Sequence, residues 1–194
     1  MYVITIDQIT RWTQFLYLLL AAVWPGSLPF VKRNVHEQSI SSAMQQTALF
    51  GVGLYLLFGS PSTPELFNQP IFPVTLPIAL AGLGLAICGV GFSIWARLIL
   101  GENWSNFPTI KHDHALIVSG PYRIVRHPIY TGLLIALLGS ALQYGLIRSF
   151  LAVLVCAVGL YLKVSVEEEF MVHRFGEAYR RYRRNVSALV PFLF

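Results

Sequence analysis

The residue types best suited to chemistry in this chain are concentrated in one short stretch, Gly120-Pro121-Tyr122-Arg123-Ile124-Val125-Arg126-His127-Pro128-Ile129-Tyr130-Thr131-Gly132. It places two Arg, one His, two Tyr and two Pro at the start of an apolar segment. Ionisable residues at the edge of a membrane segment are costly and by default mark a functional site. Pro128 is suited to the first position of a helix, which would then carry Tyr130. We therefore interpret this stretch as one half of a binding site.

Two more polar segments are expected near this stretch. The first precedes it and has the sequence Lys111-His112-Asp113-His114-Ala115-Leu116-Ile117-Val118. The second, Glu167-Glu168-Glu169, directly follows an apolar segment. If that helix continues past Val166, the glutamates face the region of His127 and Tyr130. Polar groups gathered at one end of the spans favour an interfacial enzyme over a transporter, whose polar groups usually lie near the midplane.

The composition predicts a membrane protein. The chain is 55% hydrophobic and 12% charged, whereas a soluble domain is about 45–50% apolar and about 25% charged. A membrane-spanning helix takes about 20 mostly apolar residues. We predict an all-α fold with about five transmembrane helices, at residues 12–31, 41–58, 74–100, 129–144 and 150–166.

The same pattern predicts one membrane domain over residues 1–194, because neither a charge run nor a Ser/Gly-rich linker divides it. Residues 1–100 would contain three N-terminal helices. Residues 101–194 would contain a cofactor-binding loop, a helical hairpin and a C-terminal helix, which together would form a cytoplasmic cofactor pocket.

The Lys and Arg residues set the predicted orientation. Lys32 with Arg33, the basic residues after the third span, and five Arg after the fifth span fall on one side, whereas residues 59–73 contain none. Positive residues favour the cytoplasmic side, so we expect the N-terminus outside and the C-terminus in the cytoplasm. The membrane would be the cell membrane of a prokaryote or the endoplasmic reticulum of a eukaryote. Arg148 is the exception, which a fourth helix too short to cross fully would explain.

Several other features have a simpler structural interpretation than a functional one. Gly82-Leu83-Gly84 and Gly89-Val90-Gly91 lack the strand–turn–helix setting of a phosphate loop, so we assign them to helix packing. The His112-Asp113-His114 run with His127 lacks a Cys pair or the spacing of a zinc protease, and we predict no metal site. The net charge of +5 is assigned to contacts with lipid headgroups rather than with nucleic acid.

Aromatic and basic residues near the ends of the spans are expected at the membrane interface. Arg97 would extend its head group toward water near the end of the third span. A cluster of four Arg after the fifth span would contact headgroups: Arg180, Arg181, Arg183 and Arg184. The four Trp residues would form interfacial belts rather than line a pocket: Trp12, Trp24, Trp95 and Trp104.

The polar residues on the cytoplasmic side match the functional groups of S-adenosylmethionine. A Glu would pair with its ammonium group, and His, Arg or backbone N–H groups with its carboxylate. Tyr rings suit its adenine, or its sulfonium centre through a cation–π contact. The sequence shows no Rossmann motif that would hold such a cofactor in the usual way.

Three ordered blocks resemble the isoprenylcysteine carboxyl methyltransferase family. They are His114-Ala115-Leu116-Ile117-Val118-Ser119-Gly120-Pro121-Tyr122, then Arg126-His127-Pro128-Ile129-Tyr130-Thr131-Gly132, and then the Glu167 cluster followed by Phe175-Gly176-Glu177-Ala178-Tyr179. Pro191-Phe192 is similar to the family's C-terminal ending. The resemblance covers residues 100–194 and is that of a short, prokaryotic-type member.

The resemblance implies an integral membrane enzyme that uses S-adenosyl-L-methionine to methylate the carboxylate of a prenylated cysteine or a similar lipophilic molecule. Its partners would be the bilayer and a lipophilic small molecule or prenylated protein. It implies that the cofactor is bound by His114, Ala115, Leu116, Ile117, Tyr122, His127, Pro128, Ile129, Tyr130 and Glu167.

One position departs from the family pattern. Where the family has a substrate-binding Arg four residues before the Glu, this chain has Lys163. Lys keeps the positive charge but lacks the planar fork that binds a carboxylate through two hydrogen bonds. No general acid or base is implied, because a carboxylate is already ionised at neutral pH. Catalysis would rest on positioning, which can contribute about 7–11 kcal/mol.

Three alternatives remain open at this point. A phospholipid or other lipid amine could be the acceptor, in which case a neutral amine and a proton acceptor would be needed. A membrane reductase with a nicotinamide cofactor would share the C-terminal architecture. A non-catalytic membrane subunit is the third alternative.

Overall fold

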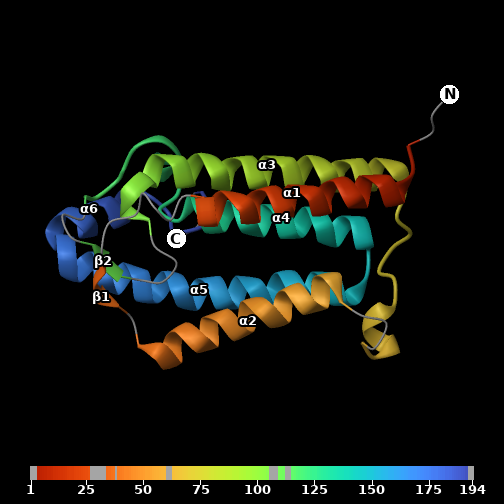
Figure 1. Ribbon diagram of the computed structural model, residues 1–194, viewed down its shortest axis with the longest axis horizontal. Coiled ribbons are helices and arrows are strands. Elements are labelled where there is room, and N and C mark those ends of the chain that lie inside the picture. Colours follow the sequence, from red (N-terminus) through yellow and green to blue (C-terminus); the bar gives the residue numbers. More distant parts are fainter. Residues whose placement is uncertain are drawn as a thin grey trace.

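The computed structural model describes residues 4–26, 34–37, 39–59, 63–104, 109–111 and 115–191. Within these residues the chain forms long, roughly parallel helices, with α3, α1 and α4 on one side of the bundle and α5 and α2 on the other (Figure 1). The elements are α1 (Ile6–Gly26), β1 (Asn34–Glu37), α2 (Ile40–Phe58), η2 (Glu65–Asn68), α3 (Leu76–Leu100), η3 (Gly101–Asn103), β2 (Thr109–Lys111), η4 (Gly120–Arg123), α4 (Pro128–Tyr144), α5 (Ile147–Phe175) and α6 (Glu177–Asn185).

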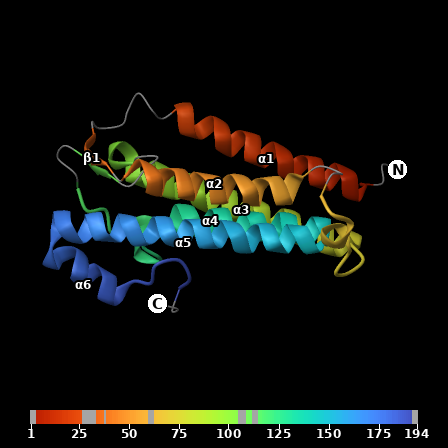
Figure 2. The ribbon, with the colours of Figure 1, turned by 90° about the horizontal axis from the view of Figure 1, so that it is seen from below.

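Local sequence signals set several helix ends. Ser39 caps α2 by accepting a hydrogen bond from the Ser42 N–H at 3.3 Å, as short polar residues do at N-caps. Pro128 begins α4, where a missing N–H costs nothing. Gly145 ends α4 in the left-handed conformation, with φ of 62°. Gly176, with φ of 54°, separates α5 from α6 and turns the chain back beside α5 (Figure 2).

The closest helix contact in the bundle is the antiparallel pair α3 and α4. Gly82 faces Gly139, and Gly89 faces Gly132. A Cβ atom on Gly82 would lie 2.5 Å from the Gly139 carbonyl oxygen, and one on Gly89 would lie 2.6 Å from the Ala136 nitrogen. Small residues allow backbones in membrane bundles to approach this closely. The predicted packing role is confirmed for Gly82 and Gly89 and is wrong for Gly84 and Gly91, where a Cβ atom would meet nothing within 4 Å. We call the contact of Gly82 and Gly89 with α4 the α3–α4 seam.

The other three long helices, α1, α2 and α5, complete the bundle around this pair. Helix α1 lies against α3 and α4, where Leu20 packs with Val90 and Ala136. Helix α2 lies against α5, where Leu57 packs with Ala152 and Cys156. The all-α prediction is confirmed for the long elements, but the described residues also contain a short antiparallel ribbon of β1 and β2.

The connections separate into two ends of the bundle, as the distribution of basic residues predicted. The β1–β2 ribbon joins the α1–α2 and α3–α4 connections at the end where α6 lies (Figure 1). At the other end, the turn after α4 meets the segment before α3, since the Ile71 N–H donates to the Gly145 oxygen at 2.8 Å. Lys32 and Arg33 lie outside the described residues.

Arg148 lies at this second end and makes contacts that the sequence did not suggest. Its Nη1 donates to the carbonyl oxygens of Leu56 at 2.7 Å and Leu57 at 3.0 Å. The last carbonyls of a helix have no partner within it, so Arg148 satisfies the C-terminal turn of α2. The cap accounts for the contacts of this basic residue, and the prediction that the fourth helix is too short to cross fully stays a prediction.

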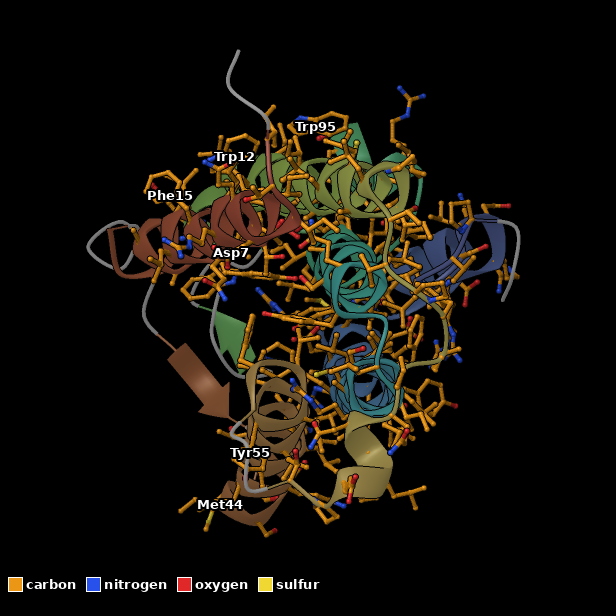
Figure 3. The ribbon with its side chains drawn as sticks, turned by 90° about the vertical axis from the view of Figure 1, so that its right-hand side faces the viewer. Asp7, Trp12, Phe15, Met44, Tyr55 and Trp95 are labelled. Carbon is orange, nitrogen blue, oxygen red and sulfur yellow. The ribbon has the colours of Figure 1, made fainter. Side chains whose placement is uncertain are left out.

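The described helices have the exterior of a membrane protein. Residues 76–103, which contain α3, and Ile147–Phe175 are long and apolar enough to cross a membrane, and Pro128–Tyr144 is apolar but shorter. Large apolar side chains point outward: Phe15 is 64% exposed and Met44 66%, and Figure 3 shows them on the outside of α1 and α2. Each of the five predicted spans contains a long helix; that all five cross the membrane stays a prediction.

Candidate functional site

A buried ion pair links the start of α4 to α5. The Arg126 side chain donates from Nε to Glu168 Oε1 at 2.7 Å, and its Nη2 lies 2.6 Å from the same oxygen. The two side chains are 5% and 8% exposed. Arg183 of α6 adds a contact from Nε to Glu168 Oε2 at 3.1 Å. Glu168 therefore holds α4, α5 and α6 together at this end of the bundle.

The neighbouring glutamate organises the second half of the cluster. The Tyr130 hydroxyl donates to Glu167 Oε1 at 2.5 Å, and His127 Nδ1 lies 3.2 Å from Glu167 Oε2. The His127 and Tyr130 rings stack with 5.8 Å between centroids and an interplanar angle of 4°. Glu169, the third glutamate of the run, is exposed. The helix does continue past Val166, and it brings Glu167 and Glu168 to His127 and Tyr130 as predicted.

The charges around His127 decide its protonation. Burial lowers the pKa of His127, but hydrogen bonds and charges from Glu167 and Glu168 outweigh burial and leave this pKa above its ordinary value. The imidazole therefore favours its charged form more than a free His does. In that form both ring nitrogens are donors, which suits the two carboxylates that face them.

The C-terminal segment closes the outer side of the cluster. The backbone N–H groups of Arg126 and His127 donate to the Ser187 and Ala188 oxygens at 2.8 and 3.0 Å. The Thr131 hydroxyl donates to the Leu189 oxygen at 2.6 Å. Arg126 Nη1 donates to the Arg183 and Val186 oxygens. Residues 186–189 thus supply acceptors to a stretch that begins before the first turn of α4.

A cavity of about 540 Å³ extends from this cluster into the bundle. Tyr130 and Lys163 line its polar end, and the Lys163 Nζ atom lies 5.5 Å from the centroid of the Tyr130 ring. The other walls are mostly apolar and come from α1, α2, α4 and α5: Tyr17, Leu20, Ala21, Gln46, Thr47, Phe50, Leu54, Phe58, Ile129, Leu133, Leu137, Gly159 and Leu160. Its volume lies within the range of about 300–1,000 Å³ that is usual for small-molecule sites.

Trp104 lines the same cavity, which corrects the prediction of an interfacial belt for this residue. Its side chain is 5% exposed, and the Arg97 guanidinium lies 4.5 Å from the centroid of the indole. Arg97 does not extend toward water either: it is 3% exposed and donates to the Gly101 oxygen at 2.9 Å. The buried guanidinium holds Trp104 in the wall of the cavity through a cation–π contact.

The other predicted belt residues differ from Trp104. Trp12 and Trp95 are 46% and 44% exposed and point outward in Figure 3. The side chain of Trp24 lies outside the described part of the structure. Closeness to the end of a predicted span does not distinguish these Trp residues. Trp12 and Trp95 lie within α1 and α3 and point outward, whereas Trp104 follows η3 and turns in toward the bundle.

Most of the predicted cofactor residues gather at this end of the bundle. Ile117, Tyr122, Ile129 and Tyr130 pack in one cluster with Ala96 and Trp104. The Tyr122 hydroxyl donates to the Ala96 oxygen at 3.3 Å, and burial raises the pKa of Tyr122 above its ordinary value. Pro128 is fully buried.

The predicted cofactor residues in the loop before this cluster are less buried than the cluster itself. The Ala115 N–H donates to Asn103 Oδ1 at 3.1 Å, and Ala115 itself is exposed. Leu116 is half-buried. His114, with His112 and Asp113, lies outside the described residues, so its predicted role and the predicted absence of a metal there stay predictions.

Three structural partners were missed from the sequence. Arg126 and Glu168 are the first two, because an ion pair between distant segments leaves no local signature. Arg183 is the third: the sequence assigned it to headgroup contacts, and the structure shows that it also pairs with Glu168. The amphipathic pattern of α6 was the available signal, because Tyr179 and Tyr182 share a face with Arg183, and Tyr182 donates to the Tyr122 oxygen at 2.5 Å.

Comparison with known families, like the motifs, assigns the chain to the methyltransferases. The family described as phospholipid methyltransferase matches residues 78–178, which is more than half of the chain. The chain belongs to this family. The matched region includes α3, α4, α5 and the Arg126–His127–Glu167–Glu168 cluster.

Curated relatives in this family include different methyltransferases. The chain is 29% identical over 157 residues to the protein-S-isoprenylcysteine O-methyltransferase of Schizosaccharomyces pombe, covering 75% of this chain and 65% of that protein. It is 32% identical over 154 residues to methanethiol S-methyltransferase 1 of Bradyrhizobium diazoefficiens, covering 71% of this chain and 53% of that protein. The chain thus spans between about half and two thirds of the length of these relatives.

A solved structure shares the fold. It is the structure of a eukaryotic intramembrane Ras methyltransferase, isoprenylcysteine carboxyl methyltransferase, with a TM-score of 0.55 and 22% identity. The alignment covers 78% of this chain and 51% of that protein. The resemblance that the motifs predicted is therefore confirmed at the level of family and fold.

Proposed function

We propose that this protein is an S-adenosylmethionine-dependent methyltransferase that acts on the carboxylate of a lipophilic acceptor at the membrane interface. One observation carries the proposal: the polar cluster of His127, Tyr130 and Glu167 adjoins the largely apolar cavity through Tyr130. Tyr130 belongs to both, since it donates to Glu167 and also lines the cavity. A cofactor held by the cluster and a lipid chain held by the cavity would meet beside Tyr130.

The residues of the cluster fit S-adenosylmethionine. Glu167 supplies a half-buried carboxylate for its ammonium group, and a carboxylate accepts more hydrogen bonds than the two that His127 and Tyr130 provide. The Tyr130 ring offers a π-face to a cation. His127, held by both glutamates, orients Glu167. The packed cluster of Ile117, Tyr122 and Ile129 offers apolar contacts for an adenine ring.

The chemistry requires positioning and the exclusion of water. S-adenosylmethionine supplies a methyl group on a sulfonium centre, so transfer forms a carbon–oxygen bond, breaks a carbon–sulfur bond and leaves the electron pair on sulfur. A carboxylate acceptor needs no proton acceptor in this reaction. Lys163 would attract that carboxylate to the polar end of the cavity, and Trp104 would cover it. Alignment of the reactants can contribute about 7–11 kcal/mol.

The apolar walls favour a long-chain acceptor over a small thiol. The relative from Bradyrhizobium diazoefficiens is named for methanethiol, which is far smaller than a cavity of about 540 Å³. An acceptor that leaves most of an apolar cavity unfilled gains little from burial, since the gain is about 0.8 kcal/mol per buried CH₂. An extended hydrocarbon chain would gain most.

Cofactor binding is tested by calorimetry with S-adenosylhomocysteine on the purified protein in detergent. We expect a heat signal for the wild-type protein and at least a tenfold weaker affinity for Glu167→Gln and His127→Gln, because each removes a contact of the cluster. Glu169→Gln is the matched control on the same helix, since Glu169 is exposed. Absence of a heat signal at millimolar ligand, with folded protein, would contradict the methyltransferase proposal. Wild-type affinity in both cluster variants would contradict the site.

The acceptor is tested by transfer of labelled methyl groups to a panel of prenylcysteines, fatty acids and lipid amines. We expect a base-labile methyl ester from the carboxylates. Lys163→Met should raise KM for these acceptors, and Lys163→Arg should restore it, because both Lys and Arg carry the charge. A base-stable product from the amines would show N-methylation instead.

The orientation and location of the protein belong to the same proposal. We propose an integral, multi-pass protein of a single membrane domain, with the polar cluster and the C-terminus on the cytoplasmic side. The β1–β2 ribbon, which follows Lys32 and Arg33 in the sequence, lies at the end of the bundle that carries α6 and its Arg residues (Figure 1). Labelling of single cysteines introduced at either end, with a membrane-impermeant reagent on whole cells, tests the orientation.

A further inference from the structure

We infer that Tyr17 and Phe58 form the closed end of the cavity and set the longest hydrocarbon chain that the acceptor can carry. This inference rests on the proposed function. It adds a specificity determinant at the end of the bundle that lies opposite the polar cluster.

The two rings meet where α1 and α2 converge. Tyr17 and Phe58 both line the cavity, and their centroids are 5.6 Å apart with an interplanar angle of 81°. This edge-to-face geometry is a favourable one for aromatic pairs. Tyr17 belongs to α1, which packs on α3 and α4, and Phe58 belongs to α2, which packs on α5. The ring pair therefore bridges the two sides of the cavity.

Further contacts hold the Tyr17 ring in place. Its hydroxyl lies 3.0 Å from Ser140 Oγ of α4, with which it shares a hydrogen bond. Ser140 is 1% exposed, so α4 offers a fixed partner. Tyr17 also packs against the buried cluster of Leu57, Leu137, Ala152 and Cys156. A side chain held from two directions is suited to act as a wall rather than as a mobile gate.

The length of the cavity follows from its lining residues. Gln46 and Phe58 lie at opposite ends of the α2 wall, which is about 18 Å of helix at 1.5 Å per residue. The polar residues Lys163 and Tyr130 lie toward the first end, and the ring pair lies at the second. An acceptor anchored by its carboxylate at Lys163 would extend its chain toward Tyr17 and Phe58.

The experiment measures chain length against binding and against turnover. A series of S-alkyl and S-prenyl mercaptopropionates of increasing length competes with a fluorescent alkyl carboxylate for the protein in phosphatidylcholine nanodiscs. For the wild-type protein we expect affinity to rise about fourfold per added CH₂ up to a limiting length, and then to stop rising. Tyr17→Ala and Phe58→Ala should each move this limit to longer chains.

Two controls separate the ring from its surroundings. Tyr17→Phe keeps the ring without the hydroxyl, and its limit should stay close to that of the wild type. Phe15→Ala, on the same helix but 64% exposed, should leave the limit unchanged. Size-exclusion chromatography and thermal unfolding in detergent confirm that each variant is folded.

The outcomes distinguish this inference from the proposed function. An unchanged limit in both Tyr17→Ala and Phe58→Ala, with methyl esters still formed, would overturn the inference and leave the proposed function standing. A limit that moves as expected, without formation of any methyl ester, would support the inference for binding while the proposed reaction fails. Affinity that rises without a limit in the wild-type protein would also overturn the inference.

Discussion

The α3–α4 seam and the cavity share helix α4 but use it in opposite ways. On the face toward α3, Gly132 and Gly139 bring the two backbones into contact. On the face toward α2 and α5, Leu133 and Leu137 line a cavity of about 540 Å³. Both faces are apolar, so hydrophobicity does not separate them. Side-chain size does: glycine allows contact at the seam, and larger residues hold the helices apart around the cavity.

The α3–α4 seam fixes the position of the helix that carries Tyr130 of the polar cluster. Ser93 of α3 donates to the Ile129 oxygen at 2.9 Å, at the first turn of α4. This hydrogen bond fixes the position of α4 along the axis of α3. Tyr130 follows directly and reaches Glu167. Protein interiors are close-packed and transmit strain, so a shift at the seam would move Tyr130. The cavity side has room to accept a ligand without such a shift.

The largest effect is expected from a bulky residue at the seam. Gly89→Leu should prevent stable folding or cost at least about 3 kcal/mol, the upper part of the usual range for overpacking, because its Cβ would lie 2.6 Å from the Ala136 nitrogen. Size-exclusion chromatography and thermal unfolding in detergent measure this loss. Gly91→Leu is the control, since a Cβ there meets nothing within 4 Å. Similar stability of the two variants would contradict the seam.

The next largest effect is expected at the buried ion pair. Glu168→Gln should destabilise the protein by about 3–5 kcal/mol, the usual cost of leaving one partner of a buried pair without compensation. The remaining Arg126 is 5% exposed and would keep its charge. Chemical unfolding monitored by Trp fluorescence measures the change. Glu177→Gln, which removes the exposed partner of Arg184, should change stability little; an equal loss would show that burial is not the cause.

A filled cavity should affect turnover more than stability. Leu133→Trp places bulk inside the cavity and should lower kcat/KM for a prenyl acceptor at least tenfold. The unfolding free energy should fall by only about 1 kcal/mol, the lower end of the usual range for added bulk, because the cavity has room for the ring. Leu138→Trp adds the same side chain on the exposed side of α4, where Leu138 is 39% exposed, and should keep wild-type turnover. Loss of turnover in both variants would contradict the position of the acceptor chain.

The smallest effect is expected from the pH dependence of His127. Its pKa is raised in the folded protein by Glu167 and Glu168, so its stabilising contribution is full below about pH 6.5, the ordinary pKa of His. That contribution is lost as the pH rises through the higher pKa of the folded state. Melting temperatures of the ligand-free protein between pH 6 and pH 9 should therefore fall more for the wild type than for His127→Gln. A parallel fall in both would remove His127 as the cause.

The sequence predicted the local elements of the site well. The Pro128 start of α4, the continuation of α5 past Val166 and the meeting of Glu167 with His127 and Tyr130 followed from helix signals and from the side on which each connection lies. The predicted packing role of Gly82 and Gly89 also holds. These features depend on neighbours in the chain or on the order of the spans.

The sequence did not predict features that depend on which helix faces meet. Trp104 and Arg97 lie inside although their position near a span end suggested the interface. Arg183 pairs with Glu168 across the turn at Gly176, where α5 ends and α6 begins. The α1 and α2 walls of the cavity lie outside the three motif blocks that predicted the site, and hydrophobicity does not indicate which side chains meet.

By itself, the sequence of this protein determined its class, its helices, the end of the bundle that carries the polar residues and the family to which the chain belongs. These follow from composition, spacing and motif, which are properties of the chain. The tertiary structure alone decided that Arg126 and Glu168 are a buried pair, that Trp104 lines a cavity and that Tyr17 meets Phe58. The physical reason is that such contacts join helices far apart in the chain, and their geometry depends on how closely small residues let the backbones approach.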